Sequence, residues 1–146
     1  MKRPRSSTIV LVLTTALLSS LATLAMRPAI AAETPKQRFF EMRTYITHDG
    51  KLDALHTRFR AHTNKLFVKH GMDLVGYWTP TDGDEAKNTL VYILAYPDRA
   101  SRDKAWNGFK NDPDWKKAFA ESHKDGVIVK KVISQFLTPT DYSPIK

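Results

Sequence analysis

The chain of 146 residues contains no cysteine. This absence excludes disulfide bonds and thiolate chemistry, so a folded domain must be stabilised by its core alone. The sequence also lacks a glycine-rich phosphate loop, a nucleophile elbow and a dinucleotide-binding fingerprint. No acyl-transfer or nucleotide-dependent reaction can therefore be built from its motifs.

Metal-ligand patterns are missing as well. No HxH, HxxxH or histidine–carboxylate set with ligand spacing occurs among the five histidines, which are His48, His56, His62, His70 and His123. On a helix, His62 and His70 would lie about 12 Å apart, too far to share one ion. We therefore expect no metal site and no bound cofactor.

Charged residues are absent from Thr8–Met26, an apolar run that follows a basic N-terminus. Arg27 and Pro28 end the run, and the small residues after them suit a signal peptidase. The pattern predicts a signal peptide over residues 1–32, cleaved after Ala31 or Ala32, and a periplasmic or secreted protein. The alternative is an uncleaved membrane anchor, because an apolar run of about 18 residues is borderline for a span.

The basic charge of the chain belongs largely to this leader. The full chain has 23 Lys and Arg against 15 Asp and Glu, a net charge of +8. Four of the bases and none of the acids precede residue 33, so the mature chain carries 19 against 15, or +4. A charge this small, spread among acids, is typical of a solvated surface and predicts no nucleic-acid partner.

Residues 33–146 are long enough for one domain and too short for two. Hydrophobic periodicity and turn residues predict six elements in the order β-α-β-β-α-β. The expected strands are Phe39–Thr47, Asp73–Pro80, Thr89–Tyr96 and Val127–Leu137; the expected helices are Lys51–His70, Asp98–Asn111 and a second piece from Asp112 to about Gly126. This α+β order is that of a ferredoxin-like fold.

Capping residues support these boundaries. Gly71 suits the left-handed C-cap of the first helix. Asp98 can cap the next helix, and Asp112 can cap its second piece because Pro113 then occupies the first helical position. We expect the tail, Thr138–Lys146, to be extended.

Strand alternation divides the first strand into two sets of side chains. Met42, Thr44 and Ile46 share one face, which we expect to pack on the helices, and Glu41, Arg43 and Tyr45 share the other. With both helical regions on one side, the second sheet face would be bare in a monomer. A bare apolar face predicts a partner sheet and hence a homodimer closed into an α+β barrel.

Glu41, Arg43 and Tyr45 are the first candidates for a site, lining the barrel interior or the dimer interface. As a functional group they would orient an anionic or carbonyl substrate. The alternative is a structural ion pair across the dimer, since buried pairs need partners whatever their role.

His62, Trp78 and Trp106 are the remaining candidates. His62 suits a general base or a hydrogen-bonding group in a pocket, or simply a half-buried histidine bonded to a backbone carbonyl. Trp78 and Trp106 would form the apolar walls of a ligand pocket, or belong to the core and the dimer interface.

Several runs of this sequence together resemble one family, the NIPSNAP proteins. The resemblance extends from Phe39 to Pro144 through the runs Phe39–Tyr45, Lys69–Met72, Leu74–Trp78, Thr89–Tyr96, Arg102–Trp106, Asp112–Trp115 and Thr138–Pro144. It implies a dimeric α+β barrel. Single positions that match the family are Glu41, Arg43, Tyr45, His62, His70, Gly71, Trp78, Tyr96, Arg102, Trp106, Pro113 and Trp115.

The resemblance leaves the activity open, because NIPSNAP proteins have no agreed reaction. Two departures concern the shape of the pocket: Ile93–Tyr96 lacks a family tryptophan, and Asp141–Pro144 replaces a Pro-Phe-Ser-Pro ending. We expect an exported homodimer that binds a small, partly apolar ligand between sheet and helices. The alternatives are a cofactor-independent or haem-using monooxygenase of the barrel type and, with less support, a protein-interaction module.

Overall fold

The computed structural model describes residues 37–146, so the expected leader, residues 1–32, lies outside the described residues. The strands are β1 (Phe39–Thr47), β2 (Asp73–Trp78), β3 (Thr89–Tyr96) and β4 (Val129–Leu137). The helices are α1 (Leu52–Arg58), α2 (Asn64–Lys69), α3 (Arg99–Asn111) and α4 (Pro113–Ser122), with a π-helical turn η1 (Phe59–Thr63) and a 3-10 turn η2 (Asp84–Lys87).

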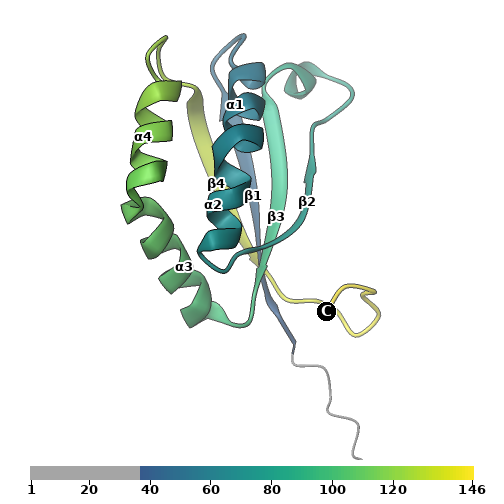
Figure 1. The fold of residues 1–146 in the computed structure, drawn as a ribbon. Helices are drawn as coiled ribbons and strands as arrows, with labels where there is room; N and C mark the ends of the chain where they lie inside the picture. The colour runs from purple at the N-terminus through teal and green to yellow at the C-terminus, as the bar shows by residue number, and fades with distance from the viewer. Residues whose placement is uncertain (1–36) are drawn as a thin grey trace, which may run out of the picture. The chain divides into compact units, whose positions relative to one another are not determined.

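The four strands form one sheet in the order β2-β3-β1-β4, with every neighbouring pair antiparallel. All four α-helices lie on one face of this sheet (Figure 1). The ferredoxin-like α+β architecture predicted from the order of elements is therefore confirmed. Among the described residues, no helix has the length and apolar character needed to cross a membrane.

The predicted caps of the second helical region are confirmed. The Asp98 side chain accepts a hydrogen bond from the Ser101 backbone N–H at 2.7 Å. Asp112 accepts one from the Asp114 N–H at 2.8 Å, with Pro113 at the start of α4. Because Asp112 leaves the helical conformation to make this cap, the helix is broken in two at that residue.

The first helical region differs from the single helix that was expected. It ends as predicted at Gly71, whose φ is +78°, but η1 interrupts it between α1 and α2. The Thr63 hydroxyl donates to the Arg58 carbonyl five residues earlier, at 3.3 Å. The wider turn shifts the buried stripe: Thr63, eight residues after Leu55, is buried, and His62, seven residues after it, is exposed.

Other boundaries differ by a few residues. β2 ends at Trp78 rather than at Pro80, η2 forms within the expected loop, and β4 begins at Val129. The tail is not extended. The Ser143 N–H donates to the Thr140 carbonyl at 3.1 Å, and the Lys146 ammonium donates to two backbone carbonyls of the same turn.

The core lies between the sheet and the helices and is rich in aromatic rings. Phe67 packs against Tyr92, Trp106 and Phe109 with ring centroids 4.8–6.0 Å apart. Phe59 meets Tyr92 edge to face at 5.3 Å. Trp106 is thus a core residue, as one of the two readings of the aromatic residues predicted.

The two faces of β1 are the reverse of those predicted. Glu41 is fully buried and contacts Trp106 of α3, so Glu41, Arg43 and Tyr45 face the helices. Met42, Thr44 and Ile46 therefore lie on the open face. The division of β1 into two sets of alternating side chains was correct. The charged set can face the helices because the helix layer supplies hydrogen-bond donors for the Glu41 carboxylate, and a buried charge with such partners is tolerated.

The open face of the sheet is largely apolar, although the strand register also places Thr44, Gln135 and Lys131 on it. It carries half-buried side chains from β1 and β3, and the exposed Ile133 and Leu137 from β4. Val91 and Ile93 of β3 are only half-buried, whereas their neighbours along the strand are buried. The tail borders this face, where Phe40, Val75 and Ile93 line a hollow of about 350 Å³ with Ile145.

Candidate functional site

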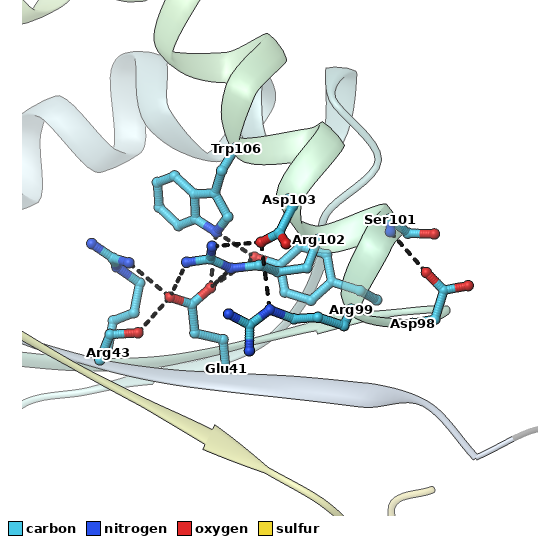
Figure 2. Close-up of polar contacts among 10 residues, drawn as sticks. Glu41, Arg43, Asp98, Arg99, Ser101, Arg102, Asp103 and Trp106 are labelled. Carbon is cyan, nitrogen blue, oxygen red and sulfur yellow. Dashed lines mark hydrogen bonds and ion pairs between the residues drawn. The ribbon is translucent and has the colours of Figure 1, made fainter.

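Glu41 is the centre of the polar cluster between sheet and helices (Figure 2). Its carboxylate accepts hydrogen bonds from Arg43 at 2.7 Å, from Arg102 at 2.7 and 2.8 Å, and from the Trp106 indole N–H at 2.8 Å. The Ser134 hydroxyl of β4 donates at 2.6 Å and the Tyr96 hydroxyl at 3.5 Å. One carboxylate therefore links β1, β3, β4 and α3.

These donors determine the protonation state of Glu41. Burial alone would raise the pKa of the carboxyl, but hydrogen bonds from Arg102, Ser134 and Arg43 outweigh burial and bring the pKa down to about 2. The carboxylate is ionised at neutral pH and its oxygens are fully engaged, since two oxygens offer about four lone-pair sites. Glu41 is consequently an anchor between layers and is poorly suited to be a general base.

Arg43 lies beneath the helix layer with Trp106 over its guanidinium, whose central carbon is 4.3 Å from the ring centroid. It bonds Glu41 through one terminal nitrogen, and its Nε is buried with no hydrogen-bond partner. Burial lowers the pKa of Arg43, but the nearby Tyr45 and Tyr92 and the bond to Glu41 raise it above the ordinary arginine value. Arg43 is thus charged and held in place.

Tyr45 belongs to the aromatic core rather than to a cavity wall. Its ring meets Tyr92 at 5.3 Å and Phe59 at 6.1 Å, both edge to face. Burial raises the pKa of Tyr92 well above the ordinary tyrosine value. Glu41, Arg43, Tyr45 and Trp106, four of the six candidates, therefore do come together, as parts of one packed cluster.

His62 lies elsewhere. It is solvent-exposed on η1 and borders a groove of about 550 Å³ between α2 and α4, lined by His62, Lys65, Leu66, Lys69, Asp114, Lys117, Ala118 and Glu121. The structure does not bring His62 together with Arg43, which packs against Trp106 inside the domain. His62 is exposed rather than half-buried because the π-helical turn rotates it away from the buried face of the helix.

A smaller hollow of about 230 Å³ continues this groove along α4, and the two share His62, Ala118 and Glu121. The hollow adds Thr57, Arg58, Ala61 and Ser122 to the lining. We call the two together the interhelical groove. It has an apolar floor, formed by the buried Leu66 and Ala118.

Trp78 is also separate from Arg43 and Trp106. It is 52% exposed at the end of β2, the edge strand. Its indole covers Gly76, where an added Cβ would lie 2.6 Å from the ring. The expectation that Trp78 and Trp106 form two walls of one pocket is therefore not met.

Asp112 forms a second polar junction, between α2 and α4. It pairs with the Lys69 ammonium at 2.8 Å and with His70 Nε2 at 2.7 Å, in addition to capping α4. These bonds, from Lys69 first and then His70, hold the pKa of the Asp112 carboxyl well below its usual range.

Two residues of these sites were not predicted from the sequence. Ser134 donates to Glu41 from β4, and only the strand register, which pairs it with Arg43, reveals this. Arg58 is buried at the end of the interhelical groove. A signal for Arg58 existed, because it follows Leu55 by three residues and so shares the buried helix face.

Within residues 37–146, no group of three or more His, Asp or Glu side chains is arranged to hold a metal ion. The expectation that the protein uses neither metal nor cofactor stays a prediction.

A model of the NIPSNAP family matches residues 40–144. The chain belongs to the NIPSNAP family. Among curated proteins no relative matches. Solved structures do: a NIPSNAP family protein of unknown function from Agrobacterium tumefaciens is 22% identical with a TM-score of 0.67, and the match covers 77% of this chain and 97% of that one.

Two further structures extend the comparison. An uncharacterised NIPSNAP-like domain protein from Burkholderia xenovorans is 17% identical, with a TM-score of 0.65 over 75% of this chain and 90% of its own. SnoaB, a cofactor-independent oxygenase from Streptomyces nogalater, is 15% identical, with a TM-score of 0.51 over 74% of this chain and 98% of its own. Identities this low show the shared fold and leave the activity of this NIPSNAP protein open.

Proposed function

We propose that this NIPSNAP protein is a homodimer that binds a small, partly apolar ligand without turnover, and that the ligand occupies the interhelical groove. The observation that carries the proposal is the groove itself. Its main part holds about 550 Å³ over the apolar floor of Leu66 and Ala118. Small-molecule sites pair such a volume with polar groups that orient the ligand, and the lining here supplies six: His62, Lys65, Lys69, Asp114, Lys117 and Glu121.

The polar cluster around Glu41 supports binding rather than catalysis. A general base needs a pKa near the working pH and a free lone pair, and Glu41 has neither. The cluster instead fixes α3 to three strands, which holds the helix layer over the sheet and so keeps the groove in shape. Rigid elements on either side are what a preformed binding site requires.

The homodimer is supported by the open face of the sheet. Ile133 and Leu137 are 39% and 37% exposed there, next to the half-buried Met42, Ile46 and Ile93. An apolar patch of this kind is typical of a surface that a partner covers. A second copy of the same sheet would cover it and close a barrel, as the family resemblance implies.

Export is supported by the sequence of the leader alone: a basic start, an uncharged apolar run and small residues near position 32. We propose a periplasmic or secreted protein whose ligand comes from that compartment. The oxygenase alternative has only the likeness to SnoaB, which shows the fold alone.

Native mass spectrometry of the protein isolated from its own host tests the binding proposal. We expect the mass of a dimer together with a non-covalent small-molecule adduct. Ala61 is exposed and lines the groove, so Ala61→Trp should fill the groove and remove the adduct. Ala54→Trp, at an exposed alanine of α1 outside the groove lining, is the matched control. An adduct that persists in Ala61→Trp would place the ligand elsewhere.

A further inference from the structure

Arg58 is a buried cation whose charge the described residues leave without an anion. The residue is only 4% exposed, and no carboxylate among residues 37–146 lies within ion-pair distance of its guanidinium. One terminal nitrogen donates to the Ser122 hydroxyl at 3.2 Å, and its Nε is buried with no hydrogen-bond partner. A buried charge in this condition is costly unless something else pairs with it.

Aromatic rings compensate Arg58 only in part. The central carbon of its guanidinium lies 5.4 Å from the ring centroid of Trp115 and 5.6 Å from that of Phe119. Burial lowers the pKa of Arg58, because the charged form is less well solvated there than in water. By contrast, Arg43 and Arg102 each have a carboxylate partner in Glu41.

The surroundings of Arg58 point in the same direction. It lines the narrow end of the interhelical groove. Lys65 and Lys117 stand on opposite walls of the wide part, on α2 and α4, and neither has an ion-pair partner within the described part of the chain. The two carboxylates of the lining are engaged: Asp114 lies 3.7 Å from Lys69, and Glu121 lies 2.7 Å from Lys124.

We propose that Arg58, with Lys65 and Lys117, forms an anion subsite of the interhelical groove, and that the ligand is a small carboxylate with an apolar body. This rests on the proposed function and names its ligand class. The planar guanidinium matches a carboxylate through two parallel hydrogen bonds, and the buried Leu66 and Ala118 receive the apolar part. Bound, the anion would give Arg58 the partner that it lacks.

Octanoate and octanamide are matched probes, because they share an apolar body and differ in charge. We expect octanoate to change the fluorescence of the protein saturably, since Trp115 lies over Arg58, and octanamide to bind at least about tenfold more weakly, the effect of one charge-assisted pair. Inorganic phosphate is added as a competitor, to distinguish a site for an acid with an apolar body from a site that binds any small anion. We expect phosphate not to displace octanoate.

Arg58→Met keeps the apolar stem between Trp115 and Phe119 and removes the charge. It should weaken octanoate about tenfold or more and leave octanamide unchanged. Arg60→Met is the matched control, because Arg60 is an exposed arginine of the same helical turn and lies outside this groove. Ala61→Trp should abolish the octanoate signal and so locate it.

A second variant guards against unfolding of Arg58→Met. Lys65→Gln with Lys117→Gln changes two exposed side chains and should weaken octanoate several-fold at low salt, a difference that 1 M NaCl removes. Unchanged octanoate affinity in either variant, or displacement by phosphate, would overturn the assignment. Equal binding of octanoate and octanamide would overturn the anion subsite but not the proposal that the groove binds a small ligand. That broader proposal is overturned if the protein isolated from its host carries no ligand.

Discussion

At the scale of single residues, the two buried sites differ in whether their charges have partners. Glu41 accepts hydrogen bonds from two arginines, a tryptophan, a serine and a tyrosine. Arg58 has no ion-pair partner among the described residues, and its Nε has no hydrogen-bond partner. A buried carboxylate whose hydrogen bonds are all satisfied stabilises the structure. A buried cation without an anionic partner is a candidate for binding a ligand. We therefore expect substitution of Glu41 to lower the stability of the fold, and substitution of Arg58 to lower the affinity for the ligand.

Glu41→Gln should destabilise the fold strongly. The amide cannot carry the charge that Arg43 and Arg102 require, and loss of one partner of a buried ion pair costs about 3–5 kcal/mol. Chemical denaturation monitored by circular dichroism measures the change. Glu85→Gln, at an exposed position of η2, is the control and should cost close to nothing. A small effect of Glu41→Gln would mean that the cluster is not an anchor.

Acid should destabilise the protein partly through the same carboxylate. The pKa of Glu41 is about 2 in the folded state against an ordinary 4.5, so its contribution is fully present above pH 4.5 and is lost as the pH falls toward 2. The shift corresponds to about 3 kcal/mol of the free energy of unfolding. The pH dependence of stability, measured in wild type and in Glu41→Gln, should differ by that amount; identical acid profiles would contradict the low pKa.

At the scale of secondary-structure elements, close contact between α2 and α3 is made possible by Gly108. A Cβ at that position would lie 2.7 Å from His70 Nδ1, and His70 is held by Asp112 at 2.7 Å through its other nitrogen. Helix propensity alone would favour alanine at position 108, but the approach of the two helices excludes it.

Gly108→Ala should therefore destabilise the wild-type protein in spite of its better helix propensity. In the background of His70→Ala the obstacle is gone, and the same substitution should stabilise by up to about 1 kcal/mol. A double-mutant cycle on thermal or chemical unfolding measures the reversal of sign. Additive effects of the two substitutions would show that Gly108 is not required by His70.

Asp112→Ala should lower the melting temperature more than Asp98→Ala. Each substitution removes a helix cap, a loss worth about 1 kcal/mol. Asp112 additionally joins Lys69 and His70 of the first helical region to α4. Differential scanning calorimetry of both variants makes the comparison, and equal melting temperatures would reduce Asp112 to a simple cap.

The elements also show how far the sequence could be interpreted. The order, the caps at Asp98 and Asp112 and the left-handed Gly71 were predictable because each rests on local chemistry. The π-helical turn was not predictable, because it differs from an α-helical turn by only one extra residue. This extra residue turns His62 away from the buried face of the helix and toward the groove. The parity of β1 was predictable, but which face met the helices depended on donors from α3 and β4, distant in sequence.

At the scale of the whole molecule, the open sheet face and the leader carry the remaining predictions. Ile93 lies on the open face, half-buried. Ile93→Asp should convert the proposed homodimer to monomer or prevent folding, because burial of an unpaired charge is costly. Size-exclusion chromatography with light scattering reads the mass, and Lys104→Asp, on the exposed surface of α3, should leave the dimer intact. A stable wild-type monomer at micromolar concentration would contradict the homodimer.

Processing of the leader is tested by the intact mass of the mature protein. We expect the chain to begin at Ala32 or Glu33, because the small residues before these positions suit a signal peptidase. A chain that still begins at Met1 and fractionates with membranes would support an uncleaved anchor.

The location of the ligand is the central claim. The measurement that tests it most directly is a crystal structure of the protein isolated from its host with whatever it carries. We predict density for a small molecule in the interhelical groove, with its apolar part on Leu66 and Ala118. Density on the open sheet face or beside Glu41, with the groove filled by water, would contradict the account.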